Sequence, residues 1–248
     1  MTASENPLDP SPALEIFLLG TVDFEDAQAL QRRLVYDLGD RGGGGLILCE
    51  HPPTISVGRG GSRAHIQPDD EALREMGIRV HWVNRGGGCV LHLPGQLNAY
   101  LALPLDPNRL NVQGFLDGLH RVTLDVLQEF DLQGTLREDA PGVYLGHSRV
   151  ATVGVAVGRW IAYHGLTLNV GTYLSAFDLL NEPGHGGFAL RQTSMEARRQ
   201  RPTPMAKVRE SVIRHIESTF GLTRHHIYTD HPLIRRKVRP HVHVASLG

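Results

Sequence analysis

The sequence predicts an α+β fold in which helices flank a mixed or antiparallel β-sheet. Two kinds of hydrophobic periodicity predict it: apolar residues recur at helical spacing in about four segments, and shorter segments are alternating or continuously apolar, as strands are. The chain has 248 residues, of which 41% are hydrophobic, so it is long enough to bury a sizeable core. We therefore expect one large domain in which strands and helices are intermixed along the chain.

The two ends of the chain differ in composition from the part between them. Residues 1–13 are polar and rich in proline and serine, which is typical of a disordered leader. Residues 221–248 are rich in histidine and arginine, and we expect them to form a tail. The periodic segments lie within residues 14–220, which form the predicted domain.

Strands and helices alternate in the first third of the chain. After Asp23, apolar residues recur every three or four positions, and the Asp23 side chain can cap the helix that they indicate. A shorter helix follows, which Asp69 or Asp70 can cap. The predicted elements are a strand at 14–19, a helix containing Ala27, Leu30, Leu34 and Leu38, a strand at 46–50, a strand and turn at 54–59, and a helix at 69–76.

An amphipathic helix and a pair of strands dominate the second half. Between about residues 112 and 130 the apolar side chains keep one stripe. Strands at 150–157 and 160–168 are joined by Gly158–Arg159, a two-residue turn whose first glycine favours type II′. Thr203–Pro204 favours a helix start, with threonine as the cap and proline in the first turn. The remaining elements are a strand at 142–145 and a helix with the apolar stripe Met205, Val208, Val212, Ile216 and Phe220.

A glycine-rich stretch between two predicted strands is the strongest candidate for a site. Residues 78–83 alternate as a strand does, and Gly86–Gly88 then lets backbone amides approach a ligand without Cβ atoms in the way. We expect His92 to project from the following strand, with Arg85 and Gln96 nearby. Amides together with these side chains suit an acyl carbonyl or a small anion. The alternative is a hairpin with a flexible tip.

The charge balance and the cysteines restrict the class of protein. The chain has 25 basic and 26 acidic residues, so its composition offers no case for binding nucleic acid or a membrane surface. It contains no run of about 18 apolar residues, which argues against a membrane span. Cys49 and Cys89 lie in apolar, strand-like segments and form no disulfide framework. We expect a globular protein of the reducing cytoplasm.

Several short segments, spread over the predicted domain, share a pattern that occurs together in one family. They are Leu48–Thr54 with Gly58–Arg59, Arg85–His92, Pro94–Gln96 with Tyr100, Ala140–Tyr144, His164–Val170 and Phe177–Leu179. In this pattern the chain resembles the lipoyl(octanoyl) transferase family of lipoate biosynthesis, within the biotin/lipoate protein ligase superfamily. Leu93 departs from the family pattern, because glycine is usual at that position.

The resemblance implies a fold, a reaction and a set of substrate-binding residues. The fold is that of the biotin/lipoate protein ligase (BPL/LPL) catalytic domain. Such enzymes transfer an octanoyl group from acyl carrier protein to a lysine of a lipoyl domain, in 2-oxoacid dehydrogenases or the glycine cleavage H protein, without ATP or another cofactor. The acyl-binding positions of the family fall here on Arg85, Gly86, Gly87, Gly88, Cys89, Val90, Leu91, His92, Thr152, Val153, Gly154, Gly165, Leu166 and Thr167.

The chain departs from the family at the two residues that carry its covalent chemistry. The family's lysine falls on Arg149, and the family's cysteine falls on Pro183. Arginine cannot act as a base at neutral pH, although its charge can meet an oxyanion or a phosphate, and proline offers neither a nucleophile nor an N–H group. We therefore expect the acceptor amine to attack the bound thioester directly, with His92 or His185 aiding proton transfer.

Two other functions stay open. A catalytically inactive paralogue would bind lipoyl or octanoyl groups, or lipoyl domains, and the loss of both reactive residues favours it. An ATP-dependent lipoate–protein ligase shares the glycine-rich motif but also needs the lysine. Cys89 is a further candidate, as a relocated thiol, although alternation places it on the opposite face from Val90 and His92.

The histidine pairs in the tail do not indicate a metal site. His225–His226 and His241–Val242–His243 have the look of ligand pairs. They lack the cysteine or carboxylate spacing that would complete a site, so we interpret them as solvated residues. We expect no bound metal and no cofactor.

Overall fold

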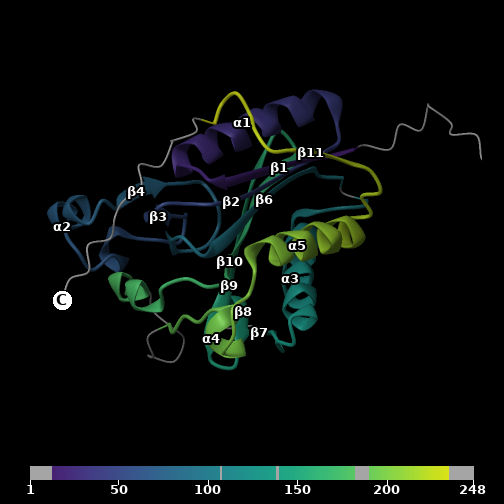
Figure 1. Cartoon of the computed structure of the whole chain (residues 1–248). Helices are drawn as coiled ribbons and strands as arrows, with labels where there is room; N and C mark the ends of the chain where they lie inside the picture. Colours follow the sequence, from purple (N-terminus) through teal and green to yellow (C-terminus); the bar gives the residue numbers. More distant parts are fainter. Residues whose placement is uncertain (1–12, 107, 138–139, 182–189, 235–248) are drawn as a thin grey trace, which may run out of the picture.

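Helices cover both faces of a mixed eight-stranded sheet, and a second sheet of three strands packs beside it (Figure 1). This confirms the predicted α+β class. The computed structural model describes residues 13–106, 108–137, 140–181 and 190–234. The predicted leader therefore lies outside the described residues, apart from Ala13.

The large sheet runs in the order β11-β1-β2-β6-β10-β9-β8-β7. β1 is parallel to β11 and β2, and the pairs from β2 onwards are antiparallel. In chain order its strands are β1 (Leu14–Thr21), β2 (Gly44–Glu50), β6 (Gln96–Pro104), β7 (Thr135–Arg137), β8 (Ala140–Leu145), β9 (Ser148–Gly158), β10 (Ile161–Asn169) and β11 (His225–Tyr228). The small sheet consists of β3 (Thr54–Val57), β4 (Arg79–Trp82) and β5 (Cys89–His92), in the order β4-β3-β5.

The helices divide between the two faces of the large sheet. α1 packs on β2, β6 and β10 from one face, while α3 and α5 pack together on the other (Figure 1). Their bounds are α1 (Phe24–Arg41), α2 (Asp70–Glu75), α3 (Val112–Glu129), α4 (Met195–Arg199) and α5 (Met205–Phe220), with 3₁₀ turns at Arg63–His65 and Leu174–Leu179.

The alternation of β6 separates the two packing layers. Leu97, Leu101 and Leu103 belong to the aliphatic core beneath α3 and α5, and each is at most 4% exposed. Tyr100 and Ala102 point the other way and join the layer beneath α1. α1 does not cover that second face completely, and the small sheet covers the rest.

One predicted turn is wrong by one residue. The hairpin between β9 and β10 has Arg159 and Trp160 at its tip, with φ of 53° and 60°, and Ile161 pairs with Gly158. Two successive positive φ values are those of a type I′ turn, whose twist matches that of the strands, so Gly158 stays in β9. Tertiary contacts stabilise this choice: the Arg159 guanidinium lies over the Tyr36 ring, and the Trp160 carbonyl accepts from Leu105 N–H.

Of the three helix-capping side chains that the sequence predicts, the structure confirms one and differs at two. Asp69 caps α2, because its Oδ1 accepts from the backbone N–H groups of Glu71 and Ala72. Asp23 occupies the N-cap position of α1 but makes no capping bond. The predicted Thr203 cap is wrong: Pro204 is the N-cap residue of α5, and the Thr203 hydroxyl accepts from Arg199.

Part of the predicted tail belongs to the large sheet, because residues 225–228 form β11 and pair in parallel with β1.

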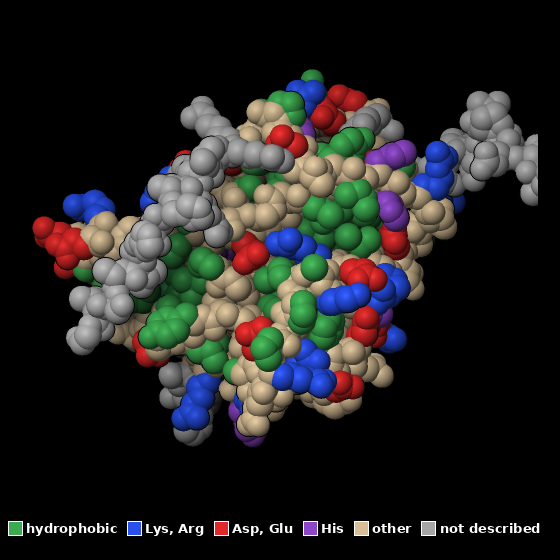
Figure 2. All heavy atoms as spheres, viewed as in Figure 1, with side chains coloured by type: hydrophobic (Ala, Val, Ile, Leu, Met, Phe, Trp, Pro, Cys, Tyr) green, Lys and Arg blue, Asp and Glu red, His purple; other side chains and the backbone are tan. Residues whose placement is uncertain are grey.

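On the face shown in Figure 2, basic and acidic side chains are interspersed rather than gathered by sign. An example is Glu129 of α3, which accepts hydrogen bonds from Arg214 and Ser211 of α5. Among the described residues no helix is long and apolar enough to cross a membrane.

Candidate active site

The floor of a cavity is formed where α1 leaves the large sheet uncovered. Two cross-strand rows build it: Gly154 pairs with Gly165, and Thr152 pairs with Thr167. The two glycines leave this part of the sheet without side chains, which makes it concave. Neither position tolerates a larger residue, because a Cβ at Gly165 would run into the carbonyl oxygen of Ala99, and one at Gly154 would lie 2.9 Å from that of Gly86.

The roof is the small sheet together with the glycine-rich loop that joins β4 to β5. The Arg85 side chain closes the loop on itself, since its Nη1 donates to the carbonyls of Gly86 and Gly88 at 3.0 and 3.1 Å. Its Nη2 donates to the carbonyl and the hydroxyl oxygen of Ser56 in β3, at 3.0 and 2.8 Å. Arg85 is 7% exposed. The loop is therefore held by a buried cation, which a flexible hairpin tip would lack.

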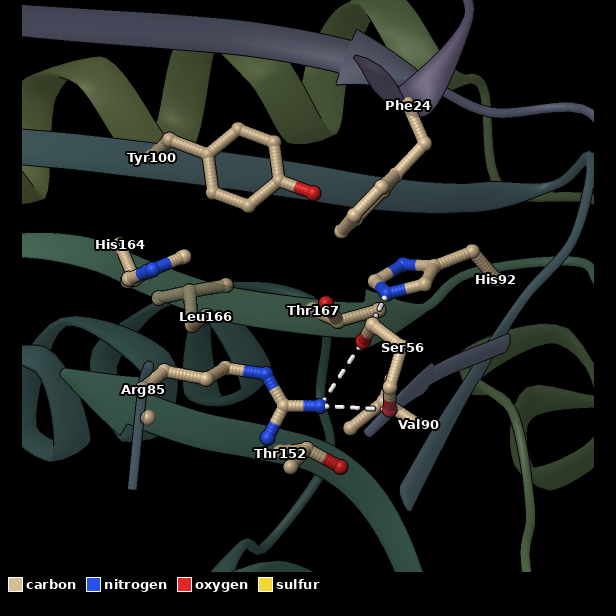
Figure 3. A pocket seen from close by; sticks show the side chains of 12 residues that line it. Phe24, Ser56, Arg85, Val90, His92, Tyr100, Thr152, His164, Leu166 and Thr167 are labelled. Carbon is tan, nitrogen blue, oxygen red and sulfur yellow. Dashed lines mark hydrogen bonds between the residues drawn. The ribbon is translucent and has the colours of Figure 1, made fainter. Parts of the chain in front are cut away.

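Between floor and roof lies a small cavity of about 20 Å³, which is space for about one water molecule. In Figure 3, Phe24 and Tyr100 lie on one side of it, Arg85 and Thr152 on the opposite side, and His92 and His164 at its two ends. It is lined by Phe24, Ser56, Arg85, Val90, His92, Tyr100, Thr152, Gly154, His164, Gly165, Leu166 and Thr167.

A chain of hydrogen bonds runs along one end of the cavity. His92 Nε2 lies 2.9 Å from Ser56 Oγ, and His92 Nδ1 lies 2.9 Å from Asn98 Oδ1. The same Oδ1 accepts from Thr167 at 2.9 Å, and Asn98 Nδ2 donates to the Cys49 carbonyl at 3.4 Å. Because Oδ1 can only accept, Nδ1 of His92 carries the proton and Nε2 is the acceptor for the Ser56 hydroxyl.

Burial keeps the histidines of this region neutral at pH 7. It lowers the pKa of His92 well below the ordinary value, and the nearby His51 and Arg85 lower it further. Burial, and then the charge of Arg85, lower the pKa of His164 to about 3. Arg85 is therefore the permanent charge among the described residues that line the cavity.

Two further aromatic residues hold the site in shape. His51 Nδ1 donates to the Val22 carbonyl at 2.8 Å, and its Nε2 accepts from the Tyr100 hydroxyl at 2.9 Å, so His51 braces the wall without lining it. His164 has a φ of 68° within β10 and stacks on Tyr163 at 4.9 Å. Backbone strain of this kind costs on the order of 1–3 kcal/mol and is concentrated at functional sites.

A second and larger hollow, of about 370 Å³, adjoins the first at Phe24. Arg32, Trp82 and Asn84 are among the residues that line it, and it is the more open of the two. Phe24, the first residue of α1, therefore stands between the first cavity and the more open hollow.

The structure brings together eight of the residues that the resemblance indicated, and the glycines of Gly86–Gly88 adjoin them in the loop around Arg85. Cys89 and Leu91 instead point into a separate apolar cluster beneath the small sheet, and Val153 points into the core beneath α3. The eight that line the cavity are Arg85, Val90, His92, Thr152, Gly154, Gly165, Leu166 and Thr167.

Gln96 and Arg149 are buried and are not among the described residues that line the cavity. Gln96 accepts from Leu93 N–H and donates to Asn169 Oδ1 at 2.8 Å, so it holds the turn between β5 and β6. Arg149 is 7% exposed, and its backbone pairs with Arg191 and Thr193. Pro183 and His185 lie outside the described residues.

Phe24, Ser56 and Asn98 are cavity or network residues that the sequence does not single out. Ser56 and Asn98 are polar residues with apolar neighbours on both sides in their strands, and both are fully buried. That contrast is the signal that could have found them, because a buried polar side chain needs a partner. Phe24 carries no such signal.

No group of histidine, cysteine and carboxylate side chains that could hold a metal occurs among the described residues. His225 pairs with Glu217, and His226 is exposed. His241 and His243 lie outside the described residues.

Comparison with known proteins identifies relatives over most of the chain. A family model of the lipoyl protein ligase A/B catalytic domain matches residues 23–217. An octanoyltransferase of Syntrophobacter fumaroxidans is 34% identical over 206 residues, which are 82% of this chain and 88% of the relative. An octanoyltransferase of Methylococcus capsulatus is 34% identical over 203 residues, which are 81% of this chain and 95% of the relative. A crystal structure of lipoate-protein ligase A bound with ATP has the same fold, with a TM-score of 0.73 at 15% identity over 89% of this chain and 90% of that one.

Proposed function

The chain belongs to the lipoyl protein ligase A/B catalytic domain family, and from this we propose that it is an octanoyltransferase of lipoate biosynthesis. Its reaction would move an octanoyl group from the thioester of acyl carrier protein to the ε-amine of a lipoyl-domain lysine. The acceptors would be lipoyl domains of 2-oxoacid dehydrogenases or the glycine cleavage H protein. No cofactor enters the reaction, because a thioester already carries an activated acyl group.

The observation that carries the proposal is the cavity between the two sheets. Its floor is concave because of Gly154 and Gly165, and Val90, Tyr100 and Phe24 give it apolar surface. It adjoins the larger hollow at Phe24, into which an alkyl chain could extend. A buried cation and a neutral histidine lie at the same walls. This combination of an apolar slot with a few polar groups suits a fatty acyl thioester.

Arg85 and His92 supply the two functions that acyl transfer requires. Negative charge develops on the carbonyl oxygen when a nucleophile attacks, and the buried guanidinium of Arg85 would stabilise it. The nucleophile loses a proton, and the unprotonated Nε2 of His92, which accepts from the Ser56 hydroxyl in the free protein, would receive it. Both side chains are held by hydrogen bonds before any substrate arrives.

In this proposal Arg149 has a structural role. Its backbone bonds tie residues 191 and 193 to β9. The family's cysteine position, Pro183, precedes these residues in the sequence. His185 stays a candidate for proton transfer from that segment.

The test is intact-mass analysis of a lipoyl domain incubated with octanoyl–acyl carrier protein and this protein, with and without ATP. We expect one octanoyl group to appear on the lipoyl domain at the same rate in both reactions. A rate that depends on ATP would contradict the proposal and favour a ligase. Absence of the adduct, together with binding of the lipoyl domain, would favour an inactive paralogue.

A further inference from the structure

Ser56 occupies the position of a nucleophile in this cavity. Its Oγ lies 2.9 Å from His92 Nε2, and Figure 3 shows the hydroxyl oxygen between the His92 ring and the Arg85 guanidinium. The residue is fully buried in β3 and lines the cavity. The hydroxyl is therefore next to the space that we assign to the acyl group.

The base beside Ser56 is oriented by a third group. His92 Nδ1 donates to Asn98 Oδ1 at 2.9 Å, and this bond directs the lone pair of Nε2 at the serine hydroxyl. Nucleophile, base and orienting side chain within hydrogen-bond distance of one another form the arrangement that activates a serine for acyl transfer.

Arg85 provides positive charge where a serine needs it. Its Nη2 donates to Ser56 Oγ at 2.8 Å, so the guanidinium stabilises negative charge on that oxygen or on a carbonyl oxygen bound next to it. The same contact leaves the serine proton directed at His92, because Oγ accepts from Arg85 and has one proton to donate.

We propose that Ser56 carries the octanoyl group between donor and acceptor, as an ester on Oγ, in the place of the family's cysteine. The inference rests on the octanoyl transfer proposed above and assigns a covalent route to it. It replaces direct attack of the amine on the thioester by two successive attacks in the same cavity.

In the first half of the reaction, Ser56 Oγ attacks the carbonyl carbon of the carrier thioester and its proton passes to His92 Nε2. The tetrahedral intermediate collapses with cleavage of the C–S bond. The thiolate takes the proton back from His92 and leaves as the thiol of the carrier. The enzyme now holds an octanoyl ester.

In the second half, the neutral ε-amine of the lipoyl-domain lysine attacks the ester carbonyl. The amine proton passes to His92 Nε2 and from there to Ser56 Oγ as the C–O bond breaks. The products are an amide on the lipoyl domain and the free serine, so the enzyme returns to its initial state.

The two cysteines are placed less favourably for the same task. Cys89 is buried in the cluster beneath the small sheet, and its Sγ contacts the Ser62 carbonyl at 3.6 Å. Cys49 is buried beneath α1, where burial raises the pKa of its thiol far above the ordinary value. Neither is among the described residues that line the cavity.

The test is to incubate the full-length protein with octanoyl–acyl carrier protein, without a lipoyl domain, and to measure its intact mass after acid quenching. We expect a gain of one octanoyl group that survives neutral hydroxylamine, as an oxygen ester does and a thioester does not. Peptide mapping should place the group on Ser56, and a lipoyl domain added afterwards should remove it.

Three variants complete the test. Ser56→Ala should form no adduct, and its rate of octanoyl transfer should fall by at least about 100-fold. Ser56→Cys should form an adduct that hydroxylamine removes, which also shows that the variant folds. Ser211→Ala is the matched control, because Ser211 is fully buried in α5 and bonds to Glu129, and it should behave as the wild type.

The outcomes separate this inference from the function on which it rests. Transfer by Ser56→Ala at the wild-type rate would overturn the covalent role of Ser56 and leave octanoyl transfer in place. An adduct mapped to Cys89 or to a threonine of the cavity would do the same. A wild-type protein that neither gains octanoyl nor transfers it would overturn both.

Discussion

Side chains on both faces of β6 are buried, but one face packs against aliphatic side chains and the other holds a hydrogen-bonded polar network. Leu97, Leu101 and Leu103 meet aliphatic side chains beneath α3 and α5. On the other face, Asn98 is fully buried and accepts hydrogen bonds from His92 and Thr167. One strand thus carries a core and a polar network.

The difference indicates which face of β6 serves function. A buried polar group is unfavourable unless it is hydrogen-bonded, and an apolar residue of similar size would serve stability at least as well. The network around Asn98 is bonded throughout and ends at the cavity, at Ser56 and Arg85. We infer that the network serves chemistry, while the leucines of β6 serve stability.

The largest expected effect is a loss of activity, caused by a substitution in the polar network on the Asn98 face of β6. His92→Gln keeps a side chain that can bond to Ser56 and Asn98 but cannot take a proton. We expect the rate of octanoyl transfer to fall by about 10²- to 10⁴-fold, which is the usual contribution of a general base. Single-turnover intact-mass kinetics measures it, and a rate near that of the wild type would exclude His92 as the base.

On the aliphatic face the expected effect is on stability. Leu101→Ala removes a fully buried side chain and should lower the free energy of unfolding by about 2–5 kcal/mol. Below its unfolding transition the variant should still transfer octanoyl at the wild-type rate. Urea unfolding checks the first statement, and Leu101→Met, which conserves volume, should cost less than about 1.5 kcal/mol.

A glycine pair in β9 tests the shape of the cavity. A Cβ at Gly154 would lie 2.9 Å from the Gly86 carbonyl oxygen and 3.2 Å from Arg85 Cδ, so Gly154→Ala should displace the loop that holds Arg85. A displacement of about 1 Å can lower a rate by about 10²-fold. Gly158→Ala is the control, because its Cβ would meet Tyr163 at an ordinary 3.6 Å. Equal rates for the two variants would count against the assigned position of the acyl group.

The last expected effect is the pH dependence that the buried histidines give to stability. Burial lowers the pKa of His51 to about 4 and that of His164 to about 3. Below the ordinary histidine pKa of about 6.5, the unfolded chain binds protons that the folded chain does not. The free energy of unfolding should therefore be constant above about pH 7 and fall as the pH decreases toward about 4.

Urea unfolding at several pH values measures this dependence. His51→Gln should reduce the slope, whereas His226→Gln, at an exposed position of β11, should leave it unchanged. A slope that neither variant changes would mean that other groups govern acid unfolding.

The elements of the fold could be predicted because hydrophobic periodicity reports them directly. The stripe of α3 and the alternation that places Val90 and His92 on one face of β5 are both confirmed. The turn after β9 could not be predicted in the same way. Its type depends on the register between β9 and β10 and on contacts of Arg159 that are distant in sequence.

The cavity could be predicted in part, from the residues that the family resemblance indicated. Arg85, Thr152 and Gly165 come together from segments far apart in the chain, and the resemblance indicated all three. Ser56 and Asn98 were missed because their role depends on the pairing of β3 with β5 and of β6 with β10. A buried polar residue in a strand needs a hydrogen-bond partner, but the sequence does not say which residue that partner is.

The most direct test of the division between the two faces is to measure single-turnover octanoyl transfer by His92→Gln and Leu101→Ala together, at a temperature where both are folded. We expect Leu101→Ala to transfer octanoyl at the wild-type rate despite its lower stability, and His92→Gln to be slow although it remains folded. If the two variants lost activity equally, or if only Leu101→Ala lost it, the polar face of β6 would not be the site of the chemistry.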